Sequence, residues 1–402
     1  MLERDKMNQA QGEIVCMAEL MKSAFRFALC VSVVLLAGCG GGGGGTTSGG
    51  GGTTQQEATP KISAATNTNT QNGAQMVTLT TTTSGATIYY TIDGTTPTSS
   101  SIVYEAPFLV ASNLTINAIA AVSGDTNSSV ATKTFAPNIA SDTLVWSDEF
   151  ANSTSANAQP NSLVWTYDTG NNSGWGNSEL ETYCAWGSTA TPCSTTTPNA
   201  FVAPGGGLNI VAENPSSGVY TSARMKTEGL FSFQYGRIEA SILLPESQGM
   251  WPAFWLLGNN IVTENWPACG EADVMEHIDG SDTPFGGPGT GSAPGYDWTQ
   301  SSIHGTNLNG GVPYTVTGFS AATWHTYGMI WSKGKIEYYV DTPSNVYETF
   351  TPTTQTGTWP FDQGPQFMIL NLAVGGSWPK SPDSSTPFPS TMKVDYVRVY
   401  TN

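Results

Sequence analysis

The sequence predicts an all-β protein. Its 402 residues include 12 Trp and 15 Tyr, with abundant Gly, Thr and Ser, and only 11% of them are charged. Aromatic and β-branched side chains favour strands. Short alternating runs such as residues 327–331 and 335–340 are separated by Gly, Pro and Asn turns, and the sequence has no long amphipathic heptads. The length allows two domains and a sizeable core.

The composition also narrows the classes of partner. The formal net charge of −17 argues against a surface for nucleic acid or anionic membrane, because such a surface needs clustered Lys and Arg. We expect some of the Trp and Tyr side chains to provide platforms on which sugar rings stack.

Residues 1–39 are expected to be a targeting segment. Lys22 and Arg26 precede an apolar run, residues 27–36, that is too short to span a bilayer as a stable helix. The run ends in Leu-Ala-Gly-Cys, which resembles a bacterial lipobox. This resemblance implies cleavage before Cys39, lipidation of that cysteine, and an exported lipoprotein at the outer membrane or cell surface. The alternative is an ordinary signal peptide with a chance cysteine.

Residues 40–60 consist almost wholly of Gly, Thr, Ser and Gln. Such a segment cannot bury enough apolar surface to offset the entropy lost on ordering. We therefore expect a flexible tether that holds the folded part away from the membrane.

Residues 61–137 are predicted to form a small β domain. Residues 76–79, 87–91 and 114–120 alternate or are β-branched, and Asp-Gly at 93–94 supplies a turn. The run Ala-Thr-Ile-Tyr-Tyr-Thr-Ile-Asp-Gly-Thr-Thr-Pro-Thr at 86–98 resembles the chitobiase/hexosaminidase C-terminal-type module. That resemblance implies an immunoglobulin-like β-sandwich.

The role of this module stays open between two readings. Tyr89, Tyr90 or Tyr104 could bind glycan, or the module could be a spacer whose tyrosines are core or turn residues. Strand alternation favours the spacer, because it buries one of the adjacent Tyr89 and Tyr90.

Three carboxylates crowd into residues 271–276, which read Glu-Ala-Asp-Val-Met-Glu. In a strand, Glu271 and Asp273 project from one face and Ala272 from the opposite, core-facing one. Strict alternation would turn Glu276 away from the other acids. A β-bulge at residues 274–275 would return it to their face, and bulges are common beside active sites.

Such a row of acids is costly, because like charges raise one another's pKa. Two carboxyl groups about 5–5.5 Å apart suit retaining glycoside cleavage, one as the nucleophile and one as the proton donor. A third acid between them can hold the nucleophile and help to separate the pKa values. From these six residues alone, a solvated strand edge or part of a calcium loop is an equally open interpretation.

The surrounding sequence favours the catalytic interpretation. The run Trp-Pro-x-x-Gly-Glu-x-Asp-x-x-Glu at 266–276 resembles the signature of glycoside hydrolase family 16 in its bulged, laminarinase-like form. The resemblance covers residues 142–402 and implies a concanavalin-type β-jelly-roll of two curved antiparallel sheets. Further matching segments, in the expected order, are 144–150, 174–183, 221–224, 235–240, 249–258, 370–379 and 394–400.

The resemblance also implies roles for individual residues. Glu271 would be the nucleophile, Glu276 the acid/base, and Asp273 the residue that positions Glu271. Core packing is the alternative for each tryptophan, and we expect Trp255 to be the most buried of them. The implied substrate contacts are Trp175, Asn177, Arg224, Trp251, Trp255, Trp266 and His304.

Metal chemistry is not expected at this site. The chain has three histidines and lacks the His-x-x-x-His spacing of a catalytic zinc site, so no cofactor is predicted for catalysis. The family resemblance implies one structural calcium on the convex side, with Glu149 and Asp395 as ligands and backbone carbonyls near residues 205–207.

The remaining cysteines and histidines have mainly structural interpretations. Cys184 and Cys193 lie in one loop and could pair in an exported protein, which would leave Cys269 as a buried thiol. His277 could tune Glu276 or be a structural residue, and His325 is expected to be structural.

These observations predict a monomeric, surface-anchored, retaining endo-glucanase that cuts β-1,3 linkages in laminarin-like β-glucans. The inserted Met275 argues against the unbulged form typical of lichenases, and the few Lys and Arg argue against sulfated polymers. Three alternatives stay open: a hydrolase of another β-glucan or galactan, a transglycosylase, and a non-catalytic glycan-binding lipoprotein. Residues 281–300 could border the cleft and alter its preference.

Overall fold

The computed structural model of the protein describes residues 55–67, 69–279 and 298–402. The predicted signal segment with Cys39, most of the predicted tether and most of loop 281–300 lie outside the described residues. Within the described ranges, no helix has the length and apolar character needed to cross a bilayer.

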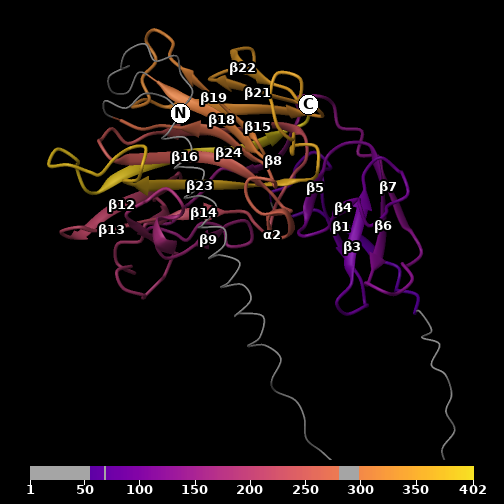
Figure 1. Cartoon of the computed structure of the whole chain (residues 1–402). Helices are drawn as coiled ribbons and strands as arrows, with labels where there is room; N and C mark the ends of the chain where they lie inside the picture. The colour runs from indigo at the N-terminus through magenta and orange to yellow at the C-terminus, as the bar shows by residue number, and fades with distance from the viewer. Residues whose placement is uncertain (1–54, 68, 280–297) are drawn as a thin grey trace, which may run out of the picture. The chain divides into compact units, whose positions relative to one another are not determined.

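Residues 61–135 form a small sandwich of two antiparallel sheets, ordered β1-β2-β5 and β4-β3-β6-β7 (Figure 1). Apolar residues from both sheets, including Val77, Leu79 and Ile116, are buried together between them, as the alternating sequence predicts. The strands are β1 (Lys61–Ala65), β2 (Gln75–Thr80), β3 (Thr87–Thr91), β4 (Ile102–Val103), β5 (Phe108–Val110), β6 (Leu114–Ala121) and β7 (Ala131–Phe135).

The predicted tether ends earlier than residue 60. Gln56 forms a parallel bridge with Thr126, and the backbone N–H of Glu57 donates to the Thr126 carbonyl at 3.1 Å. Glu57 is only 6% exposed. The backbone of this segment finds partners at the edge of the small sandwich, so its polar composition does not leave it free.

The large domain is a sandwich of two extensive sheets (Figure 1). The seven-stranded sheet has the order β19-β18-β17-β16-β23-β14-β9. Its strands are β9 (Thr166–Asp168), β14 (Arg224–Lys226), β16 (Met250–Gly258), β17 (Glu271–Glu276), β18 (Thr299–Gly305), β19 (Leu308–Tyr314) and β23 (Gln366–Val374).

The ten-stranded sheet has the order β10-β13-β12-β24-β15-β20-β21-β22, with β11 paired to β12 and β8 paired to β24. Its strands are β8 (Leu144–Asp148), β10 (Glu181–Tyr183), β11 (Ala200–Val202), β12 (Leu208–Ser216), β13 (Val219–Ser222), β15 (Gly236–Leu243), β20 (His325–Ser332), β21 (Lys335–Val340), β22 (Val346–Phe350) and β24 (Ser390–Tyr400).

One hydrophobic core lies between these two sheets. It combines Ala272 and Leu370 of the seven-stranded sheet with Ile238, Met329 and Val397 of the ten-stranded sheet, all fully buried. Among the described residues the helical elements are a single turn, η1 (Asn172–Gly174), and the four-residue α2 (Ile261–Glu264). The predicted all-β fold, a large sandwich preceded by a small β domain, is therefore confirmed.

The topology places the acidic strand well inside its sheet. Strand β17 pairs with β16 on one side and β18 on the other, and the fully buried β23 lies beyond β16. Because one face of this sheet covers the core, every second side chain of β17 projects from the opposite face. We call that opposite face the outer face of the seven-stranded sheet.

Candidate active site

Strand β17 contains the predicted bulge. Phe254 of β16 is opposite Met275, and the next residue, Trp255, is opposite Asp273, so Val274 has no partner of its own. The pairing with β18 shifts at the same place, between Asp273 and Glu276. The bulge therefore changes the phase of the strand by one residue, as the sequence predicted.

Burial shows the result of the bulge. Ala272, Val274 and Met275 are at most 3% exposed and belong to the core. The side chains of Glu271 and Asp273 are 17% and 5% exposed and lie on the outer face. Met275 thus takes the core position that strict alternation would have given to Glu276.

Glu271 sits among donors and positive charges. The indole N–H of Trp266 donates to Glu271 Oε2 at 3.0 Å, and His304 Nε2 lies 3.8 Å from Oε1. Burial and the negative charge of Asp273 raise the pKa of Glu271 to about 7, although the charges of His304 and Arg224 oppose the rise. An ionised form of Glu271 is therefore available near neutral pH.

Glu276 has a different set of partners. The indole N–H of Trp251 donates to its Oε1 at 3.1 Å, and the Ser302 hydroxyl donates to its Oε2 at 3.3 Å. Burial, followed by the charge of Asp273, raises the pKa of Glu276 to about 8. Because this pKa lies above that of Glu271, Glu276 is the carboxyl group that holds a proton more readily, as a general acid must.

His304 is a partner of the acids. Its Nε2 lies 3.2 Å from Asp273 Oδ2. Burial lowers the pKa of His304, but the hydrogen bond and charge of Asp273 outweigh that effect and raise the pKa to about 10. The sequence analysis placed His304 among the substrate contacts, whereas the structure gives it an imidazolium that partly offsets the charge of the three acids.

A second group of predicted contacts lies on β14 and β16. The Arg224 guanidinium stacks 4.6 Å from the Trp255 ring centroid and 5.1 Å from that of Trp175. Arg224 Nε is 3.1 Å from Asp168 Oδ2, and the Trp255 indole donates to Asn371 Oδ1 at 2.7 Å. These three side chains are half-buried, and the guanidinium makes cation–π contacts with both indole rings.

The structure distinguishes the tryptophans from one another. Trp266 is 53% exposed beside Glu271, whereas Trp175, Trp251 and Trp255 are half-buried. Trp255 is therefore half-buried like Trp175 and Trp251, and the structure does not single it out as the most buried tryptophan of the set. Trp266 is the one that offers most of its ring to a ligand.

Asn177 makes structural hydrogen bonds through both its side chain and its backbone. Its side-chain amide donates to Glu179 Oε1 at 3.1 Å, and its backbone carbonyl accepts from the Ser377 N–H at 2.7 Å. The second bond holds the segment before Trp378, whose ring meets that of Trp251 edge-on at 5.4 Å between centroids. Trp378 is an aromatic neighbour of the site that the sequence analysis did not single out.

A buried carboxyl pair was also missed. Glu179 and Glu181 are 6% and 0% exposed; Tyr183 donates to Glu179 at 3.0 Å and the Val374 N–H donates to Glu181 at 2.7 Å. Burial, and then the neighbouring Glu179, raise the pKa of Glu181 well above its usual range. The alternation Glu-Leu-Glu-Thr-Tyr at 179–183 was the available signal, because it places these three polar groups on one face.

The predicted calcium ligands lie on neighbouring segments of the ten-stranded sheet, Glu149 directly after β8 and Asp395 on β24, which pairs with β8. Both carboxylate oxygens of Glu149 accept from Arg398, at 2.9 and 2.7 Å, so Glu149 is engaged in an ion pair. The Phe150 carbonyl accepts from the Gly207 N–H, and Asp395 is an exposed residue of β24. Glu149 and Asp395 stay the predicted calcium ligands.

Among the described residues, one group of acids and histidine has the spacing to hold a metal ion, namely Glu271, Asp273 and His304. This group is the acidic row itself.

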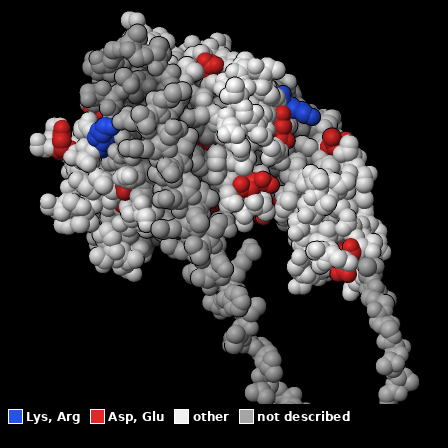
Figure 2. Space-filling view, viewed as in Figure 1, with Lys and Arg blue, Asp and Glu red and all other residues white. Residues whose placement is uncertain are grey.

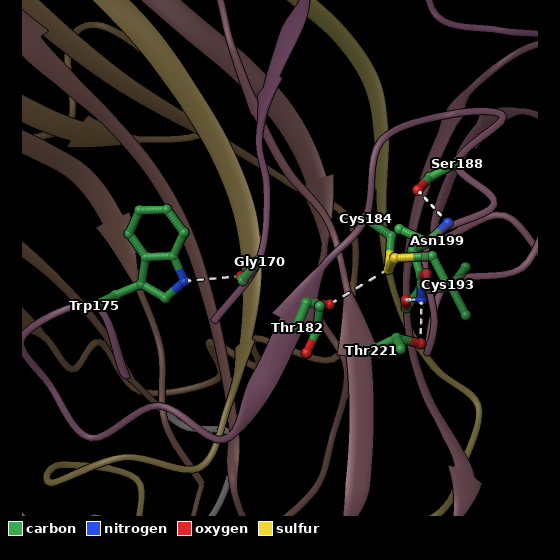
Figure 3. The surroundings of a disulfide bond; sticks show 10 residues. Gly170, Trp175, Thr182, Cys184, Ser188, Cys193, Asn199 and Thr221 are labelled. Carbon is green, nitrogen blue, oxygen red and sulfur yellow. Dashed lines mark hydrogen bonds between the residues drawn. A yellow bond between two sulfur atoms is a disulfide. The ribbon is translucent and has the colours of Figure 1, made fainter. Parts of the chain in front are cut away.

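The cysteines match the structural interpretation. Cys184 and Cys193 form a disulfide, shown in Figure 3, and Cys269 is a buried free thiol. Burial, followed by the charge of Glu271, raises the pKa of Cys269 to about 12. A thiol with so high a pKa is a poor nucleophile at neutral pH, which confirms that Cys269 is a packing residue.

The remaining histidines are structural. His277 is 1% exposed, and its Nδ1 lies 2.9 Å from the Trp298 carbonyl. Burial lowers the pKa of His277 to about 4, so this imidazole is neutral. His325 Nδ1 lies 2.9 Å from Asp341 Oδ1, directly after β21, and the His325 ring contacts that of Phe319 at a tilt, with 4.6 Å between centroids.

In the small sandwich, packing accounts for the tyrosines. Tyr90 is 1% exposed and stacks on Phe108 at 5.1 Å between centroids, while Tyr104 meets Tyr90 edge-on at 6.4 Å. As alternation predicted, one of the adjacent Tyr89 and Tyr90 is buried, and it is Tyr90. Tyr89, on the other face of β3, is half-buried.

Comparisons with known proteins agree with this site. The profile "Chitobiase/beta-hexosaminidase C-terminal domain" matches residues 66–134, and "Glycosyl hydrolases family 16" matches residues 188–398. The chain is 36% identical over 269 residues to "Beta-glucanase" of Rhodothermus marinus, covering 64% of this chain and 84% of that protein. It is 34% identical over 295 residues to "Glucan endo-1,3-beta-glucosidase A1" of Niallia circulans, covering 66% of this chain and 38% of that protein.

Solved structures show the same likeness. The laminarinase catalytic domain from Thermotoga maritima is 35% identical, with a TM-score of 0.53 over 65% of this chain and 99% of that chain. The sandwich and its row of acids therefore define a glycoside hydrolase. Within that class, the chain belongs to glycosyl hydrolases family 16 and carries an N-terminal chitobiase/beta-hexosaminidase C-terminal domain.

Proposed function

We propose that this enzyme is a retaining endo-glycosidase that hydrolyses β-1,3-glucosidic bonds in laminarin-like β-glucans. The observation that carries the proposal is the bulged strand β17, which brings Glu271 and Glu276 to one face with different partners. The similarity to a beta-glucanase, a glucan endo-1,3-beta-glucosidase and a laminarinase supports the substrate class.

The first step forms a covalent intermediate. The Glu271 carboxylate attacks the anomeric carbon, and Glu276 gives its proton to the glycosidic oxygen as the carbon–oxygen bond breaks. The indole of Trp266 holds Glu271 Oε2, and the charge of His304 keeps part of the Glu271 population ionised despite Asp273 beside it. Asp273 forms an ion pair with His304 and so holds this positive charge beside Glu271.

The second step releases the sugar. Glu276, now a carboxylate, takes a proton from water while the water oxygen displaces Glu271 at the anomeric carbon. Two displacements restore the original β configuration. An acceptor sugar in place of water would give transglycosylation by the same residues, so the product analysis must separate the two.

Surface charge supports a neutral polymer as the substrate. Figure 2 shows one face on which neutral side chains predominate and Lys and Arg are sparse. The whole chain has 14 Lys and Arg against 31 Asp and Glu. A sulfated polysaccharide would require basic side chains along its path.

The test is an assay of the full chain on laminarin, mixed-linkage glucan and agarose, with reducing ends and product sizes followed. Short oligosaccharides from laminarin are the expected result, and they should disappear in Glu271→Gln and Glu276→Gln. Cleavage of agarose alone would show that the substrate is a galactan instead of a β-glucan. Binding of laminarin without cleavage would favour a glycan-binding lipoprotein.

We also propose that the protein is exported, lipidated at Cys39, held at the outer membrane or cell surface, and monomeric. The lipobox-like sequence ending at Cys39 supports the anchor. Mass spectrometry of the mature N-terminal peptide should find a lipid-modified Cys39. An unmodified residue at another position would contradict the anchor, and sedimentation of the delipidated protein tests the monomer.

A further inference from the structure

A cavity of about 430 Å³ lies beside β9, the edge strand of the seven-stranded sheet. Its lining includes Trp165, Tyr167 and Trp186. Trp165, 2% exposed, belongs to the core and Tyr167 packs against that core, whereas Trp186 is half-buried outside it. The side chains of Gln159 and Ser162 are polar groups on exposed residues at its border. We call this cavity the edge pocket. Its volume is enough for one or two sugar rings, and the half-buried Trp186 shares its lining with amide and hydroxyl groups.

A second cavity of about 330 Å³ lies at the outer face of the same sheet. Its lining includes Trp175, Arg224 and Leu257. Leu257 is paired with Glu271 in the β16–β17 ladder, so this cavity begins one strand away from the nucleophile. It therefore belongs to the path of the substrate through the active site.

The two cavities share a wall. Glu228 lines both of them, and its carboxylate is 2.5 Å from Lys226 Nζ, which also contacts Asp168 at 2.6 Å. This ion-paired group lies at the end of β14 and beside β9. A chain that leaves the outer face past Arg224 and Lys226 would reach the edge pocket next.

Trp186 is presented by a braced loop. The Cys184–Cys193 disulfide closes the loop that carries it (Figure 3), and the Cys184 N–H donates to the Ser222 carbonyl at 2.8 Å. Within the loop, the Ser188 N–H donates to the Ala185 carbonyl at 3.1 Å. A tryptophan held this way loses little conformational entropy when a ligand stacks on it.

We propose that the edge pocket binds a distal stretch of the same neutral β-glucan chain, with a glucose ring stacked on Trp186 and its hydroxyls bonded by Gln159, Ser162 and Glu228. This inference rests on the proposed function, because the active site supplies the polymer. A neutral sugar suits the pocket better than an anionic one, because Glu228 is the charged side chain that lines it.

The test measures kinetics of the full chain on long laminarin and on a short laminari-oligosaccharide that fills only the active site. Trp186→Ala should raise the KM for long laminarin about three- to tenfold, since one aromatic platform is lost, with kcat unchanged. The short substrate should be cut as by the wild type. Trp186→Phe, which keeps an aromatic face, should recover most of the affinity, and Trp324→Ala, at a 48% exposed tryptophan outside both cavities, is the matched control.

An unchanged KM for long laminarin in Trp186→Ala would contradict glucan binding at the edge pocket and leave the proposed function intact. An equal loss on the short substrate would also overturn it, because the effect would then come from the active site. If the wild type left laminarin uncut, the proposed function would fail. Calorimetric titration of laminarin into Glu271→Gln with and without Trp186→Ala would then decide the edge pocket, which stands only if the second change weakens binding.

Discussion

The outer face of the large sandwich and the core of the small one use aromatic side chains in opposite ways. Beside the acids, the indoles of Trp266 and Trp251 donate to Glu271 and Glu276, and Trp266 is 53% exposed. In the small sandwich, Tyr90 stacks on Phe108 and is 1% exposed. An aromatic-rich sequence therefore does not locate a sugar site. A sugar site is located by the polar partner and the exposure of each aromatic ring.

The largest expected effect is the loss of either catalytic glutamate. Glu271→Gln should lower kcat on laminarin by about 10⁴-fold or more, because the amide cannot form the covalent bond. Glu276→Gln should cost about 10²- to 10⁴-fold through loss of the proton donor. Initial rates of reducing-end release measure both, with the exposed Glu264→Gln as the control.

If Glu271→Gln and Glu264→Gln lowered kcat by the same small factor, the acids of the outer face would be no more important for catalysis than an exposed surface glutamate. The comparison above would then have to be abandoned, because the buried acids would have no special role.

The pH dependence should reveal the two pKa values. Activity needs Glu271 ionised, with a pKa of about 7, and Glu276 protonated, with a pKa of about 8. The rate of laminarin cleavage should therefore fall as the pH drops below about 7 and again as it rises above about 8. A profile of kcat/KM against pH measures both limbs.

His304→Gln sharpens this prediction. The charge of His304 lowers the pKa of both glutamates, so its removal should raise them and move the optimum to higher pH. His325→Gln, at a histidine paired with Asp341, should leave the optimum in place. A shift to lower pH in His304→Gln would contradict the assigned charge.

A smaller effect is expected from the exposed Trp266. Trp266→Ala should raise the KM for laminarin about tenfold through loss of stacking. It should also lower kcat, because Glu271 loses the 3.0 Å hydrogen bond from the indole. Trp266→Phe separates the two contributions, since it should keep the KM and lose only kcat.

The smallest effect is expected in the small sandwich. Tyr89→Ala should change the affinity for laminarin less than about twofold, because the neighbouring tyrosines serve packing. Affinity electrophoresis in gels containing laminarin measures the change. A loss comparable to that of Trp266→Ala would make the module a second binding domain.

Much of the site could be predicted from the sequence because its determinants are local. The spacing of Glu271, Asp273 and Glu276 within one strand allowed the bulge at residues 274–275 to be worked out from alternation. Alternation also predicted that one of the adjacent Tyr89 and Tyr90 is buried. The buried free thiol of Cys269 followed from the expected pairing of the other two cysteines in one loop.

Features that join distant segments were not accessible in this way. His304 contacts Asp273 because β18 lies beside β17. Arg398, near the C-terminal end of the sequence, forms an ion pair with Glu149. Thr126 pairs with Gln56 near the end of the predicted tether. Such contacts depend on strand order, which alternation within one segment does not specify.

The most direct test of the mechanism is to trap the covalent intermediate. A laminari-oligosaccharide fluoride with fluorine at C2 of the reacting sugar slows both displacements, and its fluoride leaving group favours accumulation of the glycosyl-enzyme. Peptide mass spectrometry should then find the sugar attached to Glu271 in the wild type. Attachment to Glu276 or another residue, or an inverted anomer in the products of normal turnover, would contradict the assignment of Glu271 as nucleophile and Glu276 as acid.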